Sequence, residues 1–229
     1  MTTRLEEKDG GFEVTVLGPR SPRRSLVFTA GRGGCPGRHA GLLQAFADQG
    51  FRVVAPHFDR LATPVPTREA LEDRARRLVA AVARLCPPDA PLCGAGHSLG
   101  ATLLLAMAGA TAMTLGGETL VLRAAPRAFR RLALFAPPTD FFRGPGALAA
   151  VTVPIQLWAG GRDRVTPPAQ ARFLAEALRP RVPVDLRLIA AAGHFSFMDD
   201  LPPNVADPHP DRPAFLRDLA GEAGRFLAS

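Results

Sequence analysis

Apolar and polar positions repeat with two different periods along this chain. Short runs enriched in β-branched and aromatic residues predict strands, and stretches in which apolar residues recur at steps of three and four predict amphipathic helices. The predicted strands cover residues 12–17, 25–29, 51–58, 91–96, 131–136, 153–160 and 184–191. The predicted helices cover residues 38–50, 71–85, about 99 onward, 167–178 and 213–227.

The alternation of these strands and helices predicts an α/β fold. Helices that connect successive strands give a mainly parallel central sheet with helices on both faces, in three layers. The first two strands, 12–17 and 25–29, are expected to pair antiparallel across the turn with Gly and Pro between them. With 229 residues, of which 47% are hydrophobic, the chain is expected to form one domain spanning 1–229.

Composition and charge narrow the classes of function. The net charge of +7 comes almost wholly from arginine, since Lys8 is the only lysine, and the arginines are spread along the chain. No basic run is interleaved with aromatic residues, which argues against a nucleic-acid partner. The polar start of the chain predicts no signal peptide, and the longest apolar stretch, 99–115, is too short and too rich in small residues for a membrane span. A cytoplasmic location without an integral membrane segment is therefore expected.

The cysteines and most of the histidines show no metal-binding spacing. The cysteines are odd in number and are interpreted as small apolar core residues: Cys35, Cys86 and Cys93. Four histidines share no ligand spacing with cysteines or carboxylates and are interpreted as structural: His39, His57, His97 and His209. We therefore expect neither a metal ion nor another cofactor.

Ser98, Asp163 and His194 each stand in a loop directly after a predicted strand. The carboxyl ends of parallel strands share one edge of a sheet, so these three side chains are expected to meet there. A serine hydroxyl becomes a good nucleophile when an imidazole takes its proton and a carboxylate holds that imidazole. The pattern thus predicts Ser98 as nucleophile, His194 as base and Asp163 as the orienting acid.

Each of these residues also has a purely structural interpretation. Ser98 lies between Gly96 and Gly100 and could simply cap the following helix, and His194 could be an ordinary buried histidine. Asp163 could be a turn-forming residue, in which case Asp140, which also follows a strand, could orient the histidine. The presence of all three residue types after three strands favours catalysis.

The turn around Ser98 also predicts an oxyanion hole. A sharp strand-to-helix turn directs the N–H of Leu99 toward the developing oxyanion. The second donor is expected from the glycine-rich loop after strand 25–29, and we favour the N–H of Arg32. Phe195 and Phe197, beside the histidine, are candidates for lining the substrate pocket.

Three motifs carry a resemblance to a known family. GHSLG at 96–100, WAGGRDRVTPP at 158–168 and AAGHFSFMDD at 191–200 resemble the serine-nucleophile α/β hydrolases grouped as dienelactone-hydrolase-like esterases, which are related to the platelet-activating-factor acetylhydrolases. The similarity runs from about Ser25 to the C-terminus, and the order Ser, Asp, His is that of α/β hydrolases. The resemblance implies an α/β-hydrolase fold, a triad of Ser98, Asp163 and His194, and hydrolysis of carboxylic esters without a cofactor. Ser98 stands where dienelactone hydrolases in the strict sense have a cysteine, so their substrate is not carried over.

The spacing of the later strands bears on the substrate. Residues 137–152 are too few for a cap domain, which predicts an open site for small-molecule esters with short or medium acyl chains. Arginines in the longer segment 109–130 are expected near the entrance, where they would favour anionic substrates: Arg123, Arg127 and Arg130. The same triad would also serve an acyltransferase or a thioesterase. A catalytically silent binding protein of this fold is a further alternative, which the complete triad disfavours.

Overall fold

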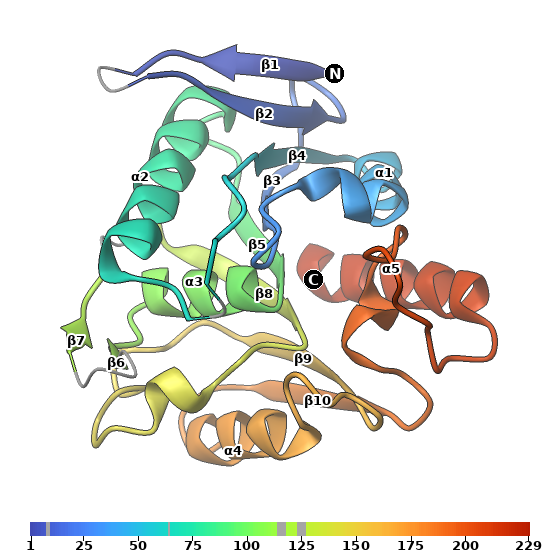
Figure 1. Cartoon of the computed structure of the whole chain (residues 1–229). Helices are drawn as coiled ribbons and strands as arrows, with labels where there is room; N and C mark the ends of the chain where they lie inside the picture. The colour runs from blue at the N-terminus through green and yellow to red at the C-terminus, as the bar shows by residue number, and fades with distance from the viewer. Residues whose placement is uncertain (8–9, 64, 114–117, 123–126) are drawn as a thin grey trace.

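The computed structural model of the chain describes residues 1–7, 10–63, 65–113, 118–122 and 127–229. Its centre is a mixed sheet of eight strands in the order β1-β2-β4-β3-β5-β8-β9-β10 (Figure 1). Neighbouring strands from β4 to β10 are parallel, whereas β1 and β2 join antiparallel at one edge. The strands of this sheet are β1 Thr2–Leu5, β2 Phe12–Leu17, β3 Arg24–Thr29, β4 Phe51–Pro56, β5 Leu92–His97, β8 Phe129–Phe135, β9 Ile155–Gly160 and β10 Val184–Ile189.

Helices cover both faces of the sheet (Figure 1). α2, α3 and α4 pack on one face, and α1 and α5 pack on the other. The α-helices are α1 Ala40–Asp48, α2 Arg68–Leu85, α3 Leu99–Met107, α4 Pro168–Leu178 and α5 Arg212–Ala228. Short 3-10 helices are η1 Pro36–His39, η2 Asp140–Phe142 and η3 His194–Phe197. The predicted three-layer α/β fold with a mainly parallel sheet is therefore confirmed.

The central strands are apolar on both faces because each face is covered by helices. In β8, Leu132 and Leu134 belong to the core shared with α2, α3 and α4, whereas Ala133 and Phe135 belong to the core shared with α1 and α5. This arrangement explains why the central strands appear in the sequence as nearly continuous apolar runs.

The predicted antiparallel pairing of residues 12–17 with 25–29 is wrong. β4 lies between these two strands: β2 pairs antiparallel with β4, and β4 pairs parallel with β3. Val53, Val54 and Ala55 of β4 are fully buried, so a position with strands on both sides satisfies its backbone and covers both of its faces. The apolar alternation of β2 and β3 identifies them as strands but does not specify their partners.

α2 shows how the sequence positions a helix. The Thr67 hydroxyl accepts a hydrogen bond from the Ala70 N–H at 3.2 Å and caps the first turn. Leu71, Ala75 and Leu78 form the buried face, as their spacing predicts. Arg74 lies on the same face and is also buried.

Two features at the periphery were not predicted. β1, which is polar, pairs with β2 and forms the outer strand of the sheet. The segment after α3 contains a strand pair, β6 Ala112–Met113 and β7 Thr119–Leu120. No helix in the described part of the chain is long and apolar enough to cross a membrane.

Candidate active site

Ser98 occupies a sharp turn between β5 and α3. Its backbone has φ 54° and ψ −129°, a left-handed conformation that a residue with a side chain rarely adopts. The turn is possible because glycines flank it. A Cβ on Gly96 would lie 2.6 Å from the Thr29 hydroxyl oxygen, and a Cβ on Gly100 would overlap the Thr29 carbonyl oxygen. The Ser98 N–H donates to the Phe135 carbonyl at 2.8 Å, which ties the turn to β8.

A chain of hydrogen bonds joins Ser98, His194 and Asp163. His194 Nε2 lies 3.0 Å from Ser98 Oγ, and His194 Nδ1 lies 2.9 Å from Asp163 Oδ2. The three residues come from the loops after β5, β9 and β10, whose carboxyl ends share one edge of the sheet. The side chains of His194 and Asp163 are 5% and 0% exposed, so water does not compete for the bond between them.

Asp163 is held as a carboxylate by its own loop. Its Oδ1 accepts hydrogen bonds from the N–H groups of Val165 at 2.8 Å and Thr166 at 2.7 Å, and its Oδ2 accepts from the Thr166 hydroxyl at 2.7 Å. Burial raises the pKa of Asp163, but the hydrogen bond and charge of His194 together with the donors of Thr166 outweigh it, so the pKa lies below its usual value. The carboxylate is therefore ionised and can accept the His194 Nδ1–H.

Thr166 contacts both Asp163 and His194, a role that the sequence motifs did not indicate. Its hydroxyl lies 3.0 Å from His194 Nδ1 and 3.2 Å from the Ala136 carbonyl, in addition to its bond to Asp163. The signal was available in the spacing, because a threonine three residues after an aspartate commonly closes a local hydrogen-bonded turn.

Asp140, the alternative orienting carboxylate, lies elsewhere. It is exposed at the start of η2 and pairs with Arg143 at 2.6 Å. No hydrogen bond of the described residues connects Asp140 with His194, whereas Asp163 makes one.

Two backbone N–H groups near Ser98, those of Leu99 and Arg32, are the predicted donors of an oxyanion hole. Leu99 is the first residue of α3, where an N–H has no partner within the helix. Gly31 presses against the nucleophile, since a Cβ on it would lie 3.0 Å from the Ser98 Cβ. Within the described residues, neither the Leu99 N–H nor the N–H of the next loop residue, Arg32, reaches a protein acceptor. Both groups are thus free to bind a substrate oxygen.

The two phenylalanines beside His194 have different surroundings. Phe195 is partly exposed, and its ring stands edge-on to the His194 imidazole with centroids 5.1 Å apart. Phe197 is fully buried and stacks against Phe135, so it belongs to the core. Only Phe195 has surface that a substrate can contact.

Three imidazoles, each tilted against the next, lie in a row that begins at His194. His39, His97 and His194 follow one another with ring centroids 5.2 and 5.0 Å apart. His97 Nε2 lies 2.9 Å from the His194 carbonyl, and His39 Nδ1 lies 3.2 Å from the Phe197 carbonyl. Burial lowers the pKa of His97 well below its usual value and lowers that of His39 to about 4. His39 and His97 are therefore neutral, and their hydrogen bonds hold the loop that carries His194.

Because burial lowers the pKa of His39, the free energy of unfolding is expected to fall at acidic pH. In the unfolded chain His39 takes up a proton as the pH falls through 6.5, whereas in the folded chain it does so only near 4. The folded state is therefore fully stable above about pH 6.5 and loses on the order of 3 kcal/mol from His39 as the pH falls to about 4. Urea unfolding between pH 7 and 4 checks this. His39→Phe should flatten the pH dependence, and an unchanged slope in that variant would contradict the assignment.

No group of three or more potential metal ligands occurs in the described part of the chain. Cys86 and Cys93 are buried, as expected, and burial raises the pKa of each thiol to about 11. The interpretation of Cys35 as a core residue is wrong, because this cysteine is exposed in the loop before η1.

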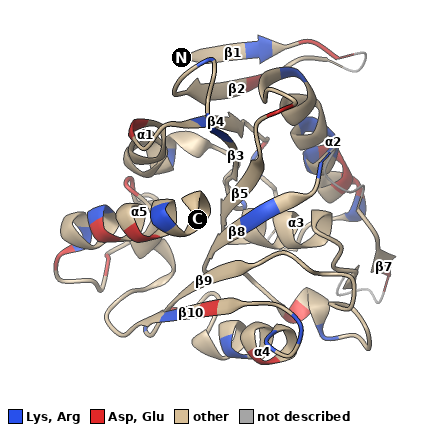
Figure 2. Cartoon of the chain, turned by 180° about the vertical axis from the view of Figure 1, so that it is seen from behind, with Lys and Arg blue, Asp and Glu red and all other residues tan. Residues whose placement is uncertain are grey.

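Two of the three arginines expected at the entrance, Arg127 and Arg130, are not near Ser98. Arg127 binds the carbonyls of Pro87 and Ala90, at 2.9 and 2.8 Å, just before β5 begins. Arg130 is the second residue of β8, so both arginines are at the amino ends of the strands and Ser98 is at the carboxyl ends. Arg123 lies outside the described residues. Figure 2 shows basic and acidic positions intermixed along α2 and α5.

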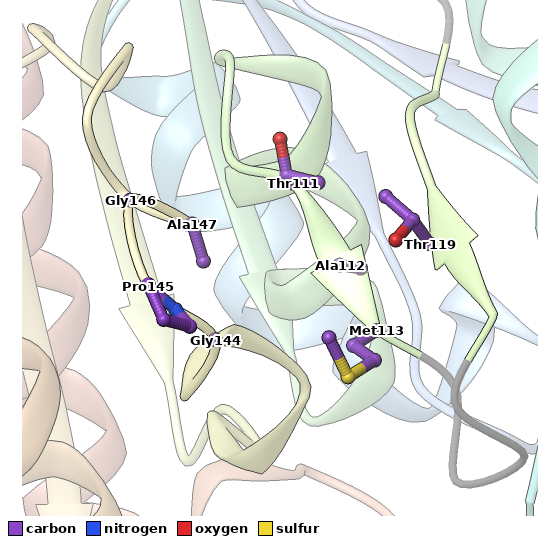
Figure 3. Close-up of a pocket in the computed structure, with 8 residues that line it drawn as sticks. All are labelled: Thr111, Ala112, Met113, Thr119, Gly144, Pro145, Gly146 and Ala147. Atoms are coloured by element: carbon purple, nitrogen blue, oxygen red, sulfur yellow. The ribbon is translucent and has the colours of Figure 1, made fainter.

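A shallow cavity of about 200 Å³ lies away from the triad. Figure 3 shows it between the β6 and β7 strand pair and the segment 144–147. β6 follows the C-terminal end of α3, whereas Ser98 precedes the N-terminal end. The segment 137–152 holds only η2 and turns, so no cap domain is inserted there.

Comparison with known proteins identifies the fold. No protein-family model matches the sequence, and no curated protein matches it significantly. Solved structures do match. Esterase 2 of Thermogutta terrifontis phosphonylated by cyclosarin has a TM-score of 0.71 at 17% identity, covering 100% of this chain and 93% of that chain. The same esterase with butyrate bound has a TM-score of 0.70 at 17% identity, covering 98% and 91%.

A protein of unknown function from Agrobacterium tumefaciens, provisionally described as an alpha/beta hydrolase, has a TM-score of 0.69 at 17% identity, covering 100% of this chain and 95% of that chain. At this level of identity the likeness is one of fold. The resemblance to the dienelactone-hydrolase-like esterases stays a prediction.

Proposed function

From the α/β-hydrolase fold and the hydrogen bonds that run from Ser98 to Asp163, we propose that the protein is a serine hydrolase that cleaves carboxylic esters. The observation that carries the proposal is the placement of His194 within 3.0 Å of Ser98 Oγ and within 2.9 Å of Asp163 Oδ2. A buried carboxylate, an imidazole and a strained serine in this order form a nucleophile and its base.

The reaction begins with attack of Ser98 Oγ on the ester carbonyl carbon. His194 Nε2 takes the hydroxyl proton, and Asp163 stabilises the imidazolium through the Nδ1–H. The carbonyl oxygen becomes an oxyanion, which accepts hydrogen bonds from the N–H groups of Leu99 and Arg32. When the carbon–oxygen bond to the alcohol breaks, His194 returns the proton to the leaving oxygen. An acyl group remains on Ser98.

Water completes the cycle by the same steps. His194 removes a proton from the water, which attacks the acyl carbon, and the carboxylic acid leaves as Ser98 regains its proton. The proposed reaction uses these side chains, two backbone N–H groups and water. A thiol or a second alcohol in place of the water would give acyl transfer with the same groups.

Short or medium acyl chains are favoured as substrates. The segment 137–152 places only η2 and turns beside the site, so no inserted domain provides a long acyl tunnel. The similar esterase from Thermogutta terrifontis has been solved with butyrate and with propionate bound, which points in the same direction. Phe195 is partly exposed next to His194, so its ring is available to contact the substrate.

Two measurements on the wild-type protein test the proposal. Treatment with a fluorophosphonate should add one adduct to the intact protein, and peptide mapping should place it on Ser98. The p-nitrophenyl esters of acetate, butyrate, octanoate and palmitate should be hydrolysed with a maximum among the shorter chains, and the matching thioesters measure the alternative chemistry. Absence of both labelling and turnover would reject the proposal and favour a silent binding protein.

A further inference from the structure

Arg74 is a buried cation held by backbone carbonyls. It lies on the inner face of α2 and is 2% exposed. In the described part of the chain no ion pair joins it to an acidic residue, although its neighbours Arg76 and Arg77 both form ion pairs. Its guanidinium packs over the Phe58 ring at 5.0 Å from the centroid. Burial lowers its pKa to about 10, so it is charged at neutral pH.

The guanidinium is satisfied by backbone carbonyls of two loops. It donates to the carbonyl oxygens of Gly31 at 2.8 Å, Arg32 at 3.1 Å and Asp59 at 2.8 Å. The first two belong to the loop after β3, which presses against Ser98, and the third belongs to the loop after β4. An arginine can hold several carbonyls at fixed angles because its donors form a rigid planar fork.

The bond from Arg74 to the Gly31 carbonyl constrains the direction of the proposed oxyanion donor. The Gly31 carbonyl and the Arg32 N–H belong to one peptide group, and in a planar trans peptide they point in opposite directions. No peptide bond of the described chain is cis. While Arg74 holds the Gly31 carbonyl on the α2 side, the Arg32 N–H must point away from α2. The Arg32 carbonyl, held by the same guanidinium, fixes the next peptide as well.

We propose that Arg74 is a positioning residue for the oxyanion hole: by binding the carbonyls of Gly31 and Arg32, it orients the Arg32 N–H toward the oxygen of the substrate. The inference rests on the proposed ester hydrolysis and adds a residue that touches neither substrate nor triad. Backbone donors hold the same carbonyls, since the Gly34 N–H donates to Gly31 at 3.0 Å and the Leu61 N–H donates to Arg32 at 3.2 Å. Arg74 adds a charged donor that binds both carbonyls at once, in a loop whose glycines at 31, 33 and 34 permit many backbone conformations.

The role predicts a specific kinetic defect. Loss of one oxyanion donor lowers kcat by about 10²- to 10³-fold, because that bond forms mainly in the transition state. Arg74→Met removes the clamp and not the donor itself, so we expect kcat to fall about 10²-fold with KM changed by less than about threefold. Arg74→Lys keeps the charge and can still bind a carbonyl, so it should recover about tenfold of that loss.

Arg127→Met is a matched control. Arg127 also binds three backbone carbonyls, those of Pro87, Pro88 and Ala90, but at the opposite end of the sheet. Its loss should lower the melting temperature as Arg74→Met does and leave kcat unchanged. The experiment measures kcat and KM with p-nitrophenyl butyrate, the melting temperature, and the inhibition constant of a trifluoromethyl ketone, whose adduct carries an oxyanion.

The expected result is a parallel loss of kcat and of ketone affinity in Arg74→Met alone. Full kcat in a folded Arg74→Met variant, or equal kinetic losses in the Arg127→Met variant, would overturn the proposal. Should Arg74→Met not fold, Arg74→Lys decides, since unchanged kcat and ketone affinity in that variant also overturn it. Failure of the proposed function has a different signature, because the wild-type protein itself would then neither react with the fluorophosphonate nor hydrolyse the ester.

Discussion

Ser98→Ala is expected to lower kcat for p-nitrophenyl butyrate about 10⁶-fold and to abolish fluorophosphonate labelling. The alanine has no oxygen to form the acyl-enzyme, and His194 has no proton to accept from it, so the triad fails as a unit. Residual turnover should come only from the oxyanion donors and substrate binding. The melting temperature should not fall, because the Ser98 side chain makes no described hydrogen bond except that to His194.

Ser25→Ala is the control for this variant. Ser25 is fully buried, like much of the site, but it lies at the amino end of β3, at the opposite edge of the sheet. Its replacement should leave both labelling and kcat unchanged. Retained labelling in Ser98→Ala would show that another residue is the nucleophile and that Ser98 only shapes the turn.

Asp163→Asn is expected to lower kcat about 10⁴-fold at neutral pH. The N–H groups of Val165 and Thr166 both donate to Oδ1, so the asparagine carbonyl oxygen will occupy that position. The amide nitrogen then takes the place of Oδ2 and points its N–H at His194 Nδ1. Nδ1 must accept this bond, which moves the imidazole proton to Nε2. In that tautomer His194 cannot take the proton of Ser98.

Asp140→Asn separates the two candidate carboxylates. Asp140 is exposed and paired with Arg143, and a surface pair of this kind contributes little stability. Its replacement should change kcat by less than about twofold. A severe loss in Asp140→Asn together with an active Asp163→Asn would reverse the assignment of the orienting acid.

Much of the fold follows from local pattern. The strands β4, β5, β8, β9 and β10 and the helices α2 and α4 lie within a few residues of their predicted positions. These elements are strongly periodic or continuously apolar, and such patterns reflect which faces are buried. β1 was missed because its residues are polar and only one of its edges is paired. The pairing of β2 with β4 was also missed, because the choice of partner depends on contacts far apart in the sequence.

The candidate site also combines residues that the sequence predicts with contacts that only the structure shows. Ser98, Asp163 and His194 could be selected from the sequence because each follows a strand, and parallel strands bring their carboxyl ends to one edge. The place of Arg74 carried a local signal, since a charged residue interrupts the apolar face formed by Leu71 and Ala75. The sequence gives no signal for the groups that Arg74 binds, because these are backbone carbonyls of distant loops and every residue type has a carbonyl.

The sequence by itself thus determined the three-layer α/β fold, the order of its main elements, and Ser98 and His194 as side chains at one edge of the sheet, with Asp163 favoured over Asp140 as their acidic partner. Only the tertiary structure decided that Asp163 and not Asp140 contacts His194, that Arg127 and Arg130 lie at the far edge, and that Arg74 holds the loop beside Ser98. The physical reason is the distance along the chain over which each interaction acts. Periodicity and turn chemistry act between neighbours in the chain, whereas strand partners, carbonyl clamps and carboxylate orientation depend on groups that only folding brings together.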